Sequence, residues 1–147
     1  MSSRAGALVD ATEATDDARS TATVRERLAR VRRELHGAGI DALLVPSSDP
    51  HLSEYLPARW RGREWLTGFT GSAGTLAMTM NRAALFVDGR YWSQAETELA
   101  DSGIETVRVA SAAGLPYVDW LVAALPRGAR VAIDGDVVAL ASATALR

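Results

Sequence analysis

The stretch Trp65–Thr75, WLTGFTGSAGT, places a glycine at every third position, namely Gly68, Gly71 and Gly74. A dinucleotide-binding loop has the spacing G-x-G-x-x-G, follows a strand and opens a helix, and a P-loop ends in Lys followed by Ser or Thr. This chain contains no Lys, and its glycines lie between an expected helix and an expected strand. The stretch therefore predicts a structural turn, with Gly68 ending the helix and Gly71 and Gly74 in tight backbone turns, and not a phosphate site.

The residues after the glycines predict a β-hairpin. Two apolar runs, Thr75–Met80 and Ala83–Val87, are separated by Asn81-Arg82. Asn81 tolerates the positive φ that a two-residue hairpin turn needs.

Helical and strand patterns alternate on both sides of this hairpin. Thr23 and Glu26 have the capping-box spacing at the start of a first helix, and Pro50 suits the first turn of a helix capped by Ser47, Ser48 or Asp49. The other expected elements are strands at 41–46, 104–109 and 129–133 and helices at 63–66, 91–99 and 115–125. This order predicts an α/β fold with three layers, in which a mixed, mostly parallel sheet with one antiparallel pair is flanked by helices.

The ends of the chain differ from its middle. Residues 1–22 are small, polar and mildly acidic, and we expect a flexible leader there. Residues 23–147 form the expected domain. The apolar pattern that begins after Asp136 stops at Arg147, so we expect the chain to be the leading part of a longer protein.

Composition excludes several classes of function. The 147 residues carry a net charge of −2 and no Cys, which argues against nucleic-acid binding, disulfides and thiolate metal sites. No apolar run approaches the ~18 residues of a membrane span, and no secretory signal is present, so we expect a cytoplasmic protein.

Three segments together resemble one known family: SSDPHLSEY (Ser47–Tyr55), GFTGSAGT (Gly68–Thr75) and DGRYW (Asp88–Trp92). From about Val24 onward the chain resembles the creatinase/prolidase N-terminal domain of Xaa-Pro aminopeptidases, most of all the first domain of the long cytosolic form. The resemblance implies an α/β domain without catalytic residues. It also implies a separate C-terminal domain in which two Asp, one His and two Glu hold two metal ions, usually manganese.

The resemblance further implies a role and partners. The chain would be the non-catalytic N-terminal domain of a metallo-exopeptidase that releases the residue before a penultimate Pro. Its partners would be the catalytic domain of the same polypeptide, a second copy in a homodimer and, through the parent enzyme, proline-containing peptides. The alternative is a free-standing interaction or dimerisation module that has lost its peptidase half.

The residues themselves offer no catalytic or metal site. His36 and His51 are the only histidines, and His51 with Glu54 at i, i+3 spacing cannot hold two metal ions. Ser72 lies in G-S-A-G, which is not a nucleophile elbow. We therefore expect no cofactor in this chain.

Other residues point to contacts and turns. The expected substrate-access or interface residues are His51, Glu54, Tyr55, Trp60, Arg63 and Trp65. Asp88 and Arg90 are expected at a turn, with Asp88 in an ion pair with Arg90 or Arg63.

Overall fold

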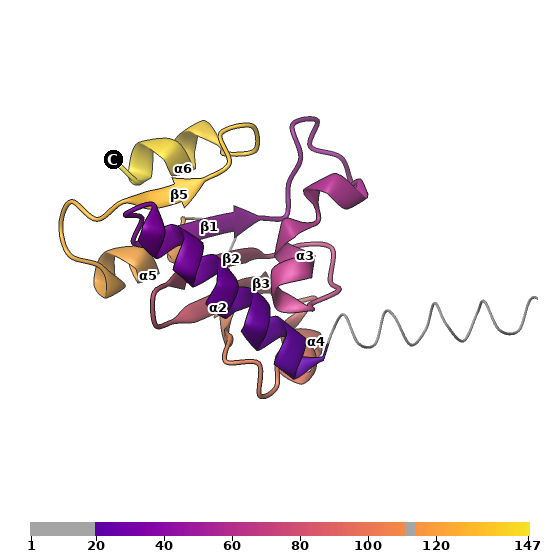
Figure 1. The fold of residues 1–147 in the computed structure, drawn as a ribbon. Coiled ribbons are helices and arrows are strands. Elements are labelled where there is room, and N and C mark those ends of the chain that lie inside the picture. The colour runs from indigo at the N-terminus through magenta and orange to yellow at the C-terminus, as the bar shows by residue number, and fades with distance from the viewer. Residues whose placement is uncertain (1–19, 111–113) are drawn as a thin grey trace, which may run out of the picture.

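The computed structural model describes residues 20–110 and 114–147, so most of the predicted leader lies outside the described residues. A five-stranded sheet forms the centre of the chain (Figure 1). Its strands are β1 (Ala42–Pro46), β2 (Thr75–Thr79), β3 (Ala83–Asp88), β4 (Glu105–Val109) and β5 (Val131–Ile133). The helices are α2 (Thr21–Gly37), α3 (Gly62–Thr67), α4 (Trp92–Glu98), α5 (Pro116–Ala124) and α6 (Leu140–Ala145), with a 3-10 turn η1 at Ala58–Trp60.

The sheet has the strand order β4-β3-β2-β1-β5. β1 is parallel to β5 and β3 is parallel to β4, while β2 runs antiparallel to both β1 and β3. Four strands therefore point the same way, and the predicted mixed, mostly parallel sheet is confirmed. The hairpin of β2 and β3 is also present, but β2 makes a second antiparallel pairing, with β1, where only one pair was expected.

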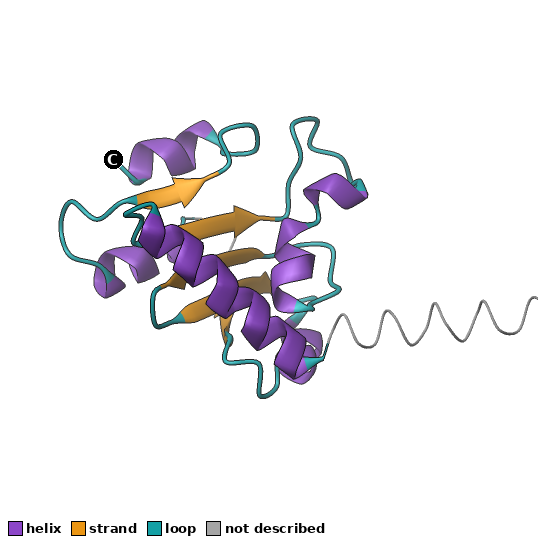
Figure 2. Ribbon diagram, viewed as in Figure 1, coloured by secondary structure: helices purple, strands orange, loops and turns teal. Residues whose placement is uncertain are grey.

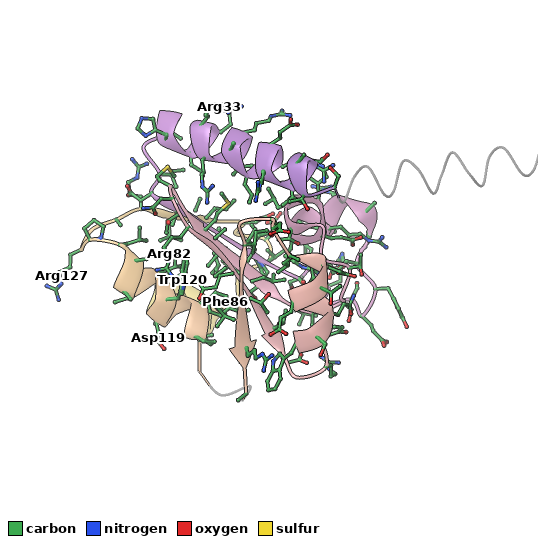
Figure 3. All side chains as sticks on the ribbon, turned by 90° about the horizontal axis from the view of Figure 1, so that it is seen from below. Arg33, Arg82, Phe86, Asp119, Trp120 and Arg127 are labelled. Atoms are coloured by element: carbon green, nitrogen blue, oxygen red, sulfur yellow. The ribbon has the colours of Figure 1, made fainter. Side chains whose placement is uncertain are left out.

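Helices cover both faces of the sheet, so the three predicted layers are present. One core cluster joins α2, α3 and α4 to the sheet through Leu28, Leu66 and Leu99. The other joins α5 to the opposite face through Leu121, with Leu146 after α6 packed against it. Figure 3 shows α2 and α5 on opposite sides of the sheet. No helix among the described residues is long and apolar enough to cross a membrane.

Aromatic packing holds α5 against the sheet. The rings of Phe86 on β3 and Trp120 on α5 meet edge to face, with centroids 6.3 Å apart. The Arg82 guanidinium lies 4.8 Å from the centroid of Trp120, and the three labelled side chains lie together in Figure 3. This arrangement buries an apolar face and leaves the arginine at the edge of the contact.

Two local predictions at α2 and the hairpin were wrong. The helix begins at Thr21, and Ser20 caps it by accepting a hydrogen bond from the Thr23 N–H at 3.3 Å, so Thr23 is not the cap. Asn81 does not have a positive φ. The Thr79 hydroxyl instead closes the hairpin turn by accepting from the Arg82 N–H at 3.1 Å.

The glycine stretch connects α3 to β2, as predicted, and its three glycines have different reasons to be there. Gly68 adopts the left-handed conformation, with φ 71°, at the C-cap of α3. Gly71 is packed so tightly that a Cβ would overlap the Phe69 ring and lie 2.8 Å from Cδ1 of Tyr91. Gly74 does not have a positive φ, and a Cβ there would lie 3.4 Å from its nearest neighbours, at the short end of ordinary contact, so neither conformation nor close packing requires glycine at this position.

Replacing Gly71 with alanine should therefore destabilise the fold. The added methyl group must displace two ring systems, and we expect Gly71→Ala to lower the free energy of unfolding by about 1–3 kcal/mol. Urea denaturation followed by tryptophan fluorescence measures this. Gly37→Ala is the matched control, because nothing lies within 4 Å of its Cβ, and it should leave stability unchanged or slightly raised. Equal stability of the two variants would contradict the packing argument.

Candidate functional site

A pocket of about 220 Å³ lies between the glycine stretch and the segment that precedes α3. It brings together four of the six predicted contact residues, namely Glu54, Tyr55, Trp60 and Arg63. Gly71 and Ser72 line the opposite wall. The other two, His51 and Trp65, do not line this pocket. Figure 2 shows the long loop between β1 and α3 that carries most of these residues.

The start of this loop is fixed by Asp49 and not by a helix. The predicted helix at Pro50 is absent, and residues between β1 and η1 form turns and bends. Asp49 Oδ1 accepts hydrogen bonds from the backbone N–H groups of His51 at 3.0 Å and Ser53 at 2.9 Å. The bond from the Ser53 N–H is the largest of the causes that lower the pKa of Asp49. His51 and Glu54 are exposed loop residues, and they do not share a helix face.

Arg63 is the best-defined side chain of the pocket, and it is buried. It is 4% exposed, and its guanidinium donates from Nη1 to the carbonyl of Phe69 at 2.5 Å and from Nε to Oγ of Ser47 at 2.9 Å. Nη2 donates to the carbonyl of Gly71 at 2.5 Å. Burial lowers the pKa of Arg63 to about 10, and the nearby carboxylate of Glu64 opposes that shift, so the group stays charged at neutral pH. Its observed contacts are internal to this chain.

Helix α4 holds the glycine stretch from its other side. The Glu98 carboxylate accepts from the backbone N–H and the hydroxyl of Thr70, both at 2.8 Å. Gln94 donates to the same hydroxyl at 2.9 Å, and Ser72 Oγ lies 2.6 Å from the hydroxyl of Tyr91. Sequence reasoning missed Glu98 and Gln94, because a polar helix face gives no sign of which loop it will contact.

Large apolar side chains of the same segment are exposed. Leu52 is 84% exposed, Tyr55 82% and Trp65 46%. The Arg27 guanidinium lies 4.7 Å from the Trp65 ring centroid, and that of Arg59 lies 5.0 Å from the Trp60 ring centroid. Exposed aromatic side chains that carry a polar atom, such as Tyr55 and Trp65, are enriched at interfaces.

Asp88 and Arg90 form the predicted ion pair at the end of β3. Asp88 accepts from Nε of Arg90 at 3.0 Å and from its Nη2 at 2.8 Å, and this side-chain contact is the main cause of the lowered pKa of Asp88. Arg63 takes no part in this ion pair. The pair is exposed and serves the turn before α4.

The part of the chain that the structure describes contains no set of side chains that could serve as metal ligands. No group of three or more His, Asp or Glu side chains there is placed to hold an ion. Asp134 accepts from the backbone N–H of Asp136 at 2.9 Å, which is turn geometry. The family resemblance implies a two-metal centre in a separate domain, and the described residues of this chain offer no set of ligands for one.

Comparison with known proteins gives a consistent result. The model of the creatinase/prolidase N-terminal domain matches residues 27–147. Xaa-Pro aminopeptidase 2 of Mus musculus is 40% identical over 108 residues, which are 74% of this chain and 16% of that protein. The chain thus spans less than a fifth of that curated relative.

Solved structures show the same likeness. The X-prolyl aminopeptidase of Caenorhabditis elegans, described as a cytosolic enzyme with a di-nuclear active site, matches with a TM-score of 0.70 and 28% identity, over 85% of this chain and 21% of that one. The N-terminal domain of the cytoplasmic peptidase PepQ of Mycobacterium tuberculosis matches with a TM-score of 0.59 and 26% identity, over 84% of this chain and 82% of that one.

Removing the Arg63 guanidinium should destabilise the fold, because its hydrogen bonds are to buried groups of this chain. Arg63→Met leaves two buried carbonyls without donors, so we expect a loss of about 2–4 kcal/mol in the free energy of unfolding. Arg63→Lys keeps the charge but cannot reach all three acceptors, and should be intermediate. The control is Arg61→Met, because Arg61 is exposed and donates to the Leu56 carbonyl alone. Urea midpoints that fall equally for Arg61→Met and Arg63→Met would rule out this role.

Proposed function

The chain belongs to the creatinase/prolidase N-terminal domain family, and we propose on this basis that it is the non-catalytic N-terminal domain of a Xaa-Pro aminopeptidase. The parent enzyme would be a metallo-exopeptidase that removes the residue before a penultimate Pro. Its two metal ions, manganese by family resemblance, would sit in a separate catalytic domain of the same polypeptide. A cytoplasmic location is proposed as well, in keeping with the Caenorhabditis elegans relative.

Within that enzyme, the loop between β1 and α3 would shape substrate access and contact the catalytic domain or a second subunit. The observation that supports this role is the exposure of Leu52 and Tyr55 on this loop and of Trp65 on the helix α3 that follows it. Aromatic side chains with a polar atom are enriched at interfaces, where one side is apolar and the other is wet. The buried Arg63 would keep the segment in one shape, so a partner would meet a preformed surface.

The alternative is an interaction module that functions without a peptidase half. It would use the same exposed segment to hold two copies together. The two proposals differ in what the isolated chain does: the first expects a domain whose partner is absent, and the second expects a stable dimer.

The isolated chain should not hydrolyse a proline peptide. Incubated with Arg-Pro-Pro and Mn²⁺, it should release no arginine above a metal-only control, because its described residues offer no set of metal ligands. Release is measured by chromatography. Turnover that depends on the chain and disappears with a chelator would refute the non-catalytic assignment.

Tyr55→Ser tests the contact surface. In the polypeptide that carries both this domain and the metal-binding domain, we expect kcat/KM for Arg-Pro-Pro to fall roughly fivefold or more, as for loss of a central interface residue. The stability of the isolated chain should not change, because Tyr55 is exposed. Val122→Ser is the matched control, since Val122 is 71% exposed on α5, on the other face of the sheet.

Two outcomes would count against the access role. Equal kcat/KM for Tyr55→Ser, Val122→Ser and the unchanged protein would exclude a contact at Tyr55. A sedimentation result in which the isolated chain is dimeric and Tyr55→Ser makes it monomeric would favour the alternative.

A further inference from the structure

The sheet topology creates a crevice that the role above does not use. β1 and β5 are adjacent and parallel, and their arrows point to the same end in Figure 2. The chain leaving β1 continues to α3, on the face covered by α2, whereas the chain leaving β5 continues to α6, whose end packs with α5 on the other face. In open α/β sheets, connections that diverge in this way leave a crevice at the carboxyl ends of the two strands, and ligands bind there.

A pocket of about 450 Å³ occupies this position. Its apolar walls include Leu44 of β1, Ile133 of β5, Tyr117 of α5 and Val138 before α6. The volume falls in the range of small-molecule sites, which combine apolar walls with a few polar groups. The position of the pocket and its lining therefore both match those of a ligand site.

One polar group in this lining lacks a partner. The Asp49 side chain is 1% exposed, and its Oδ1 accepts the two backbone N–H bonds of the loop. Its Oδ2 is also buried and has no partner within hydrogen-bond distance among the described residues, although, after the backbone N–H of Ser53, the Ser53 side chain and the His51 charge also help to lower the pKa of this carboxyl. A buried carboxylate oxygen without a donor is costly, so it calls for a donor from outside the chain.

The charges around the pocket indicate what the donor would be. Asp49 and Asp136 line it, and none of the lining residues is Arg or His. An anionic ligand would be repelled by these two carboxylates, and His51, whose charge acts on Asp49, does not line the pocket. A positively charged donor would satisfy Oδ2 and neutralise the carboxylate at once.

We propose that this crevice binds a small organic cation, an ammonium group on an apolar body. The ammonium donates to Oδ2 of Asp49, and the apolar body lies against Leu44, Ile133 and Tyr117. Because Oδ2 is covered, the cation reaches it only when the segment Pro50–Leu52 shifts, which breaks the hydrogen bond from the Leu52 N–H to the Asp49 carbonyl and the one from the His51 N–H to Oδ1. That segment is exposed, and Leu52 has a φ of 55°, a left-handed conformation that is unfavourable for a non-glycine residue and would be relieved by such a movement.

The test uses cyclohexylammonium as the probe and the full chain. Titration into ¹⁵N-labelled protein should give saturable shifts of the amides at 48–53 and 133–139, with a Kd on the order of 1 mM, as for a small fragment. Cyclohexanol and cyclohexanecarboxylate have the same ring without the positive charge, and should bind at least roughly tenfold more weakly. Equal affinity for cyclohexanol would overturn the role of Asp49, and no saturation by about 20 mM ammonium would overturn the site.

Variants separate the carboxylate from the rest of the pocket. Asp49→Asn keeps an oxygen for the two loop N–H groups but removes the charge, so affinity for cyclohexylammonium should fall roughly tenfold while that for cyclohexanol stays the same. Asp88→Asn, at an exposed carboxylate that does not line the crevice, is the control and should bind like the unchanged chain.

A second variant keeps the proposal testable if Asp49→Asn fails to fold. Ala139 lines the crevice and is exposed, so Ala139→Phe should fill it without disturbing the core and abolish binding of the probe. Unchanged affinity in Ala139→Phe or in folded Asp49→Asn would refute the proposal.

Discussion

The irregular segment between α3 and β2 depends on one buried guanidinium. Seven residues, Gly68 to Gly74, cross from a helix to the centre of a sheet, and their carbonyls need partners other than a strand or a helix. Arg63 supplies three donors in one plane, which reach Phe69, Gly71 and Ser47 at once. Glu98 satisfies the backbone N–H of Thr70 from the opposite side. The loop geometry is thus set by two charged side chains of opposite sign, from α3 and α4.

The sequence allowed the positions of helices and strands to be predicted better than the pairing of the strands. Apolar runs and turn residues were enough to locate the strands and most helices, because local periodicity reflects which face is buried. Strand order is a property of the whole chain, so the pairing of β2 with β1 was not predictable from either run. The capping box was misassigned because the helix begins at Thr21, before the apolar stripe that was used to locate its start, and Ser20 caps it.

At the candidate site, the burial of Arg63 could likewise not be predicted from the local sequence. Arg59, Arg61 and Arg63 alternate in one polar stretch, and nothing local distinguishes the one that turns inward. Arg63 is buried because Gly71 lets the chain pass close enough for its carbonyl to accept from the guanidinium, and that closeness is set by Phe69 and Tyr91. The glycine whose spacing resembles a phosphate loop is therefore explained by aromatic packing and an internal cation. The contact role of Tyr55, by contrast, rests on its residue type and its exposure, and it stays a prediction.

The loop after β1 lines two pockets with different chemistry, and two side chains, Asp49 and Arg63, hold its ends in place. Asp49 fixes the start of the loop and Arg63 its end, while the residues between them, from Pro50 to Ala58, are mostly exposed. The start faces a crevice with a carboxylate and no cation, and the later part faces a pocket with a satisfied arginine. Between these anchors the loop makes few buried contacts, and Leu56 is held through its carbonyl by Nε of the exposed Arg61, so the middle can shift while both anchors persist. Movement that extends to Leu52, whose N–H donates to the Asp49 carbonyl, would loosen the first anchor and alter the crevice and the exposed segment together, which couples the proposed cation site to the proposed contact surface through the backbone they share.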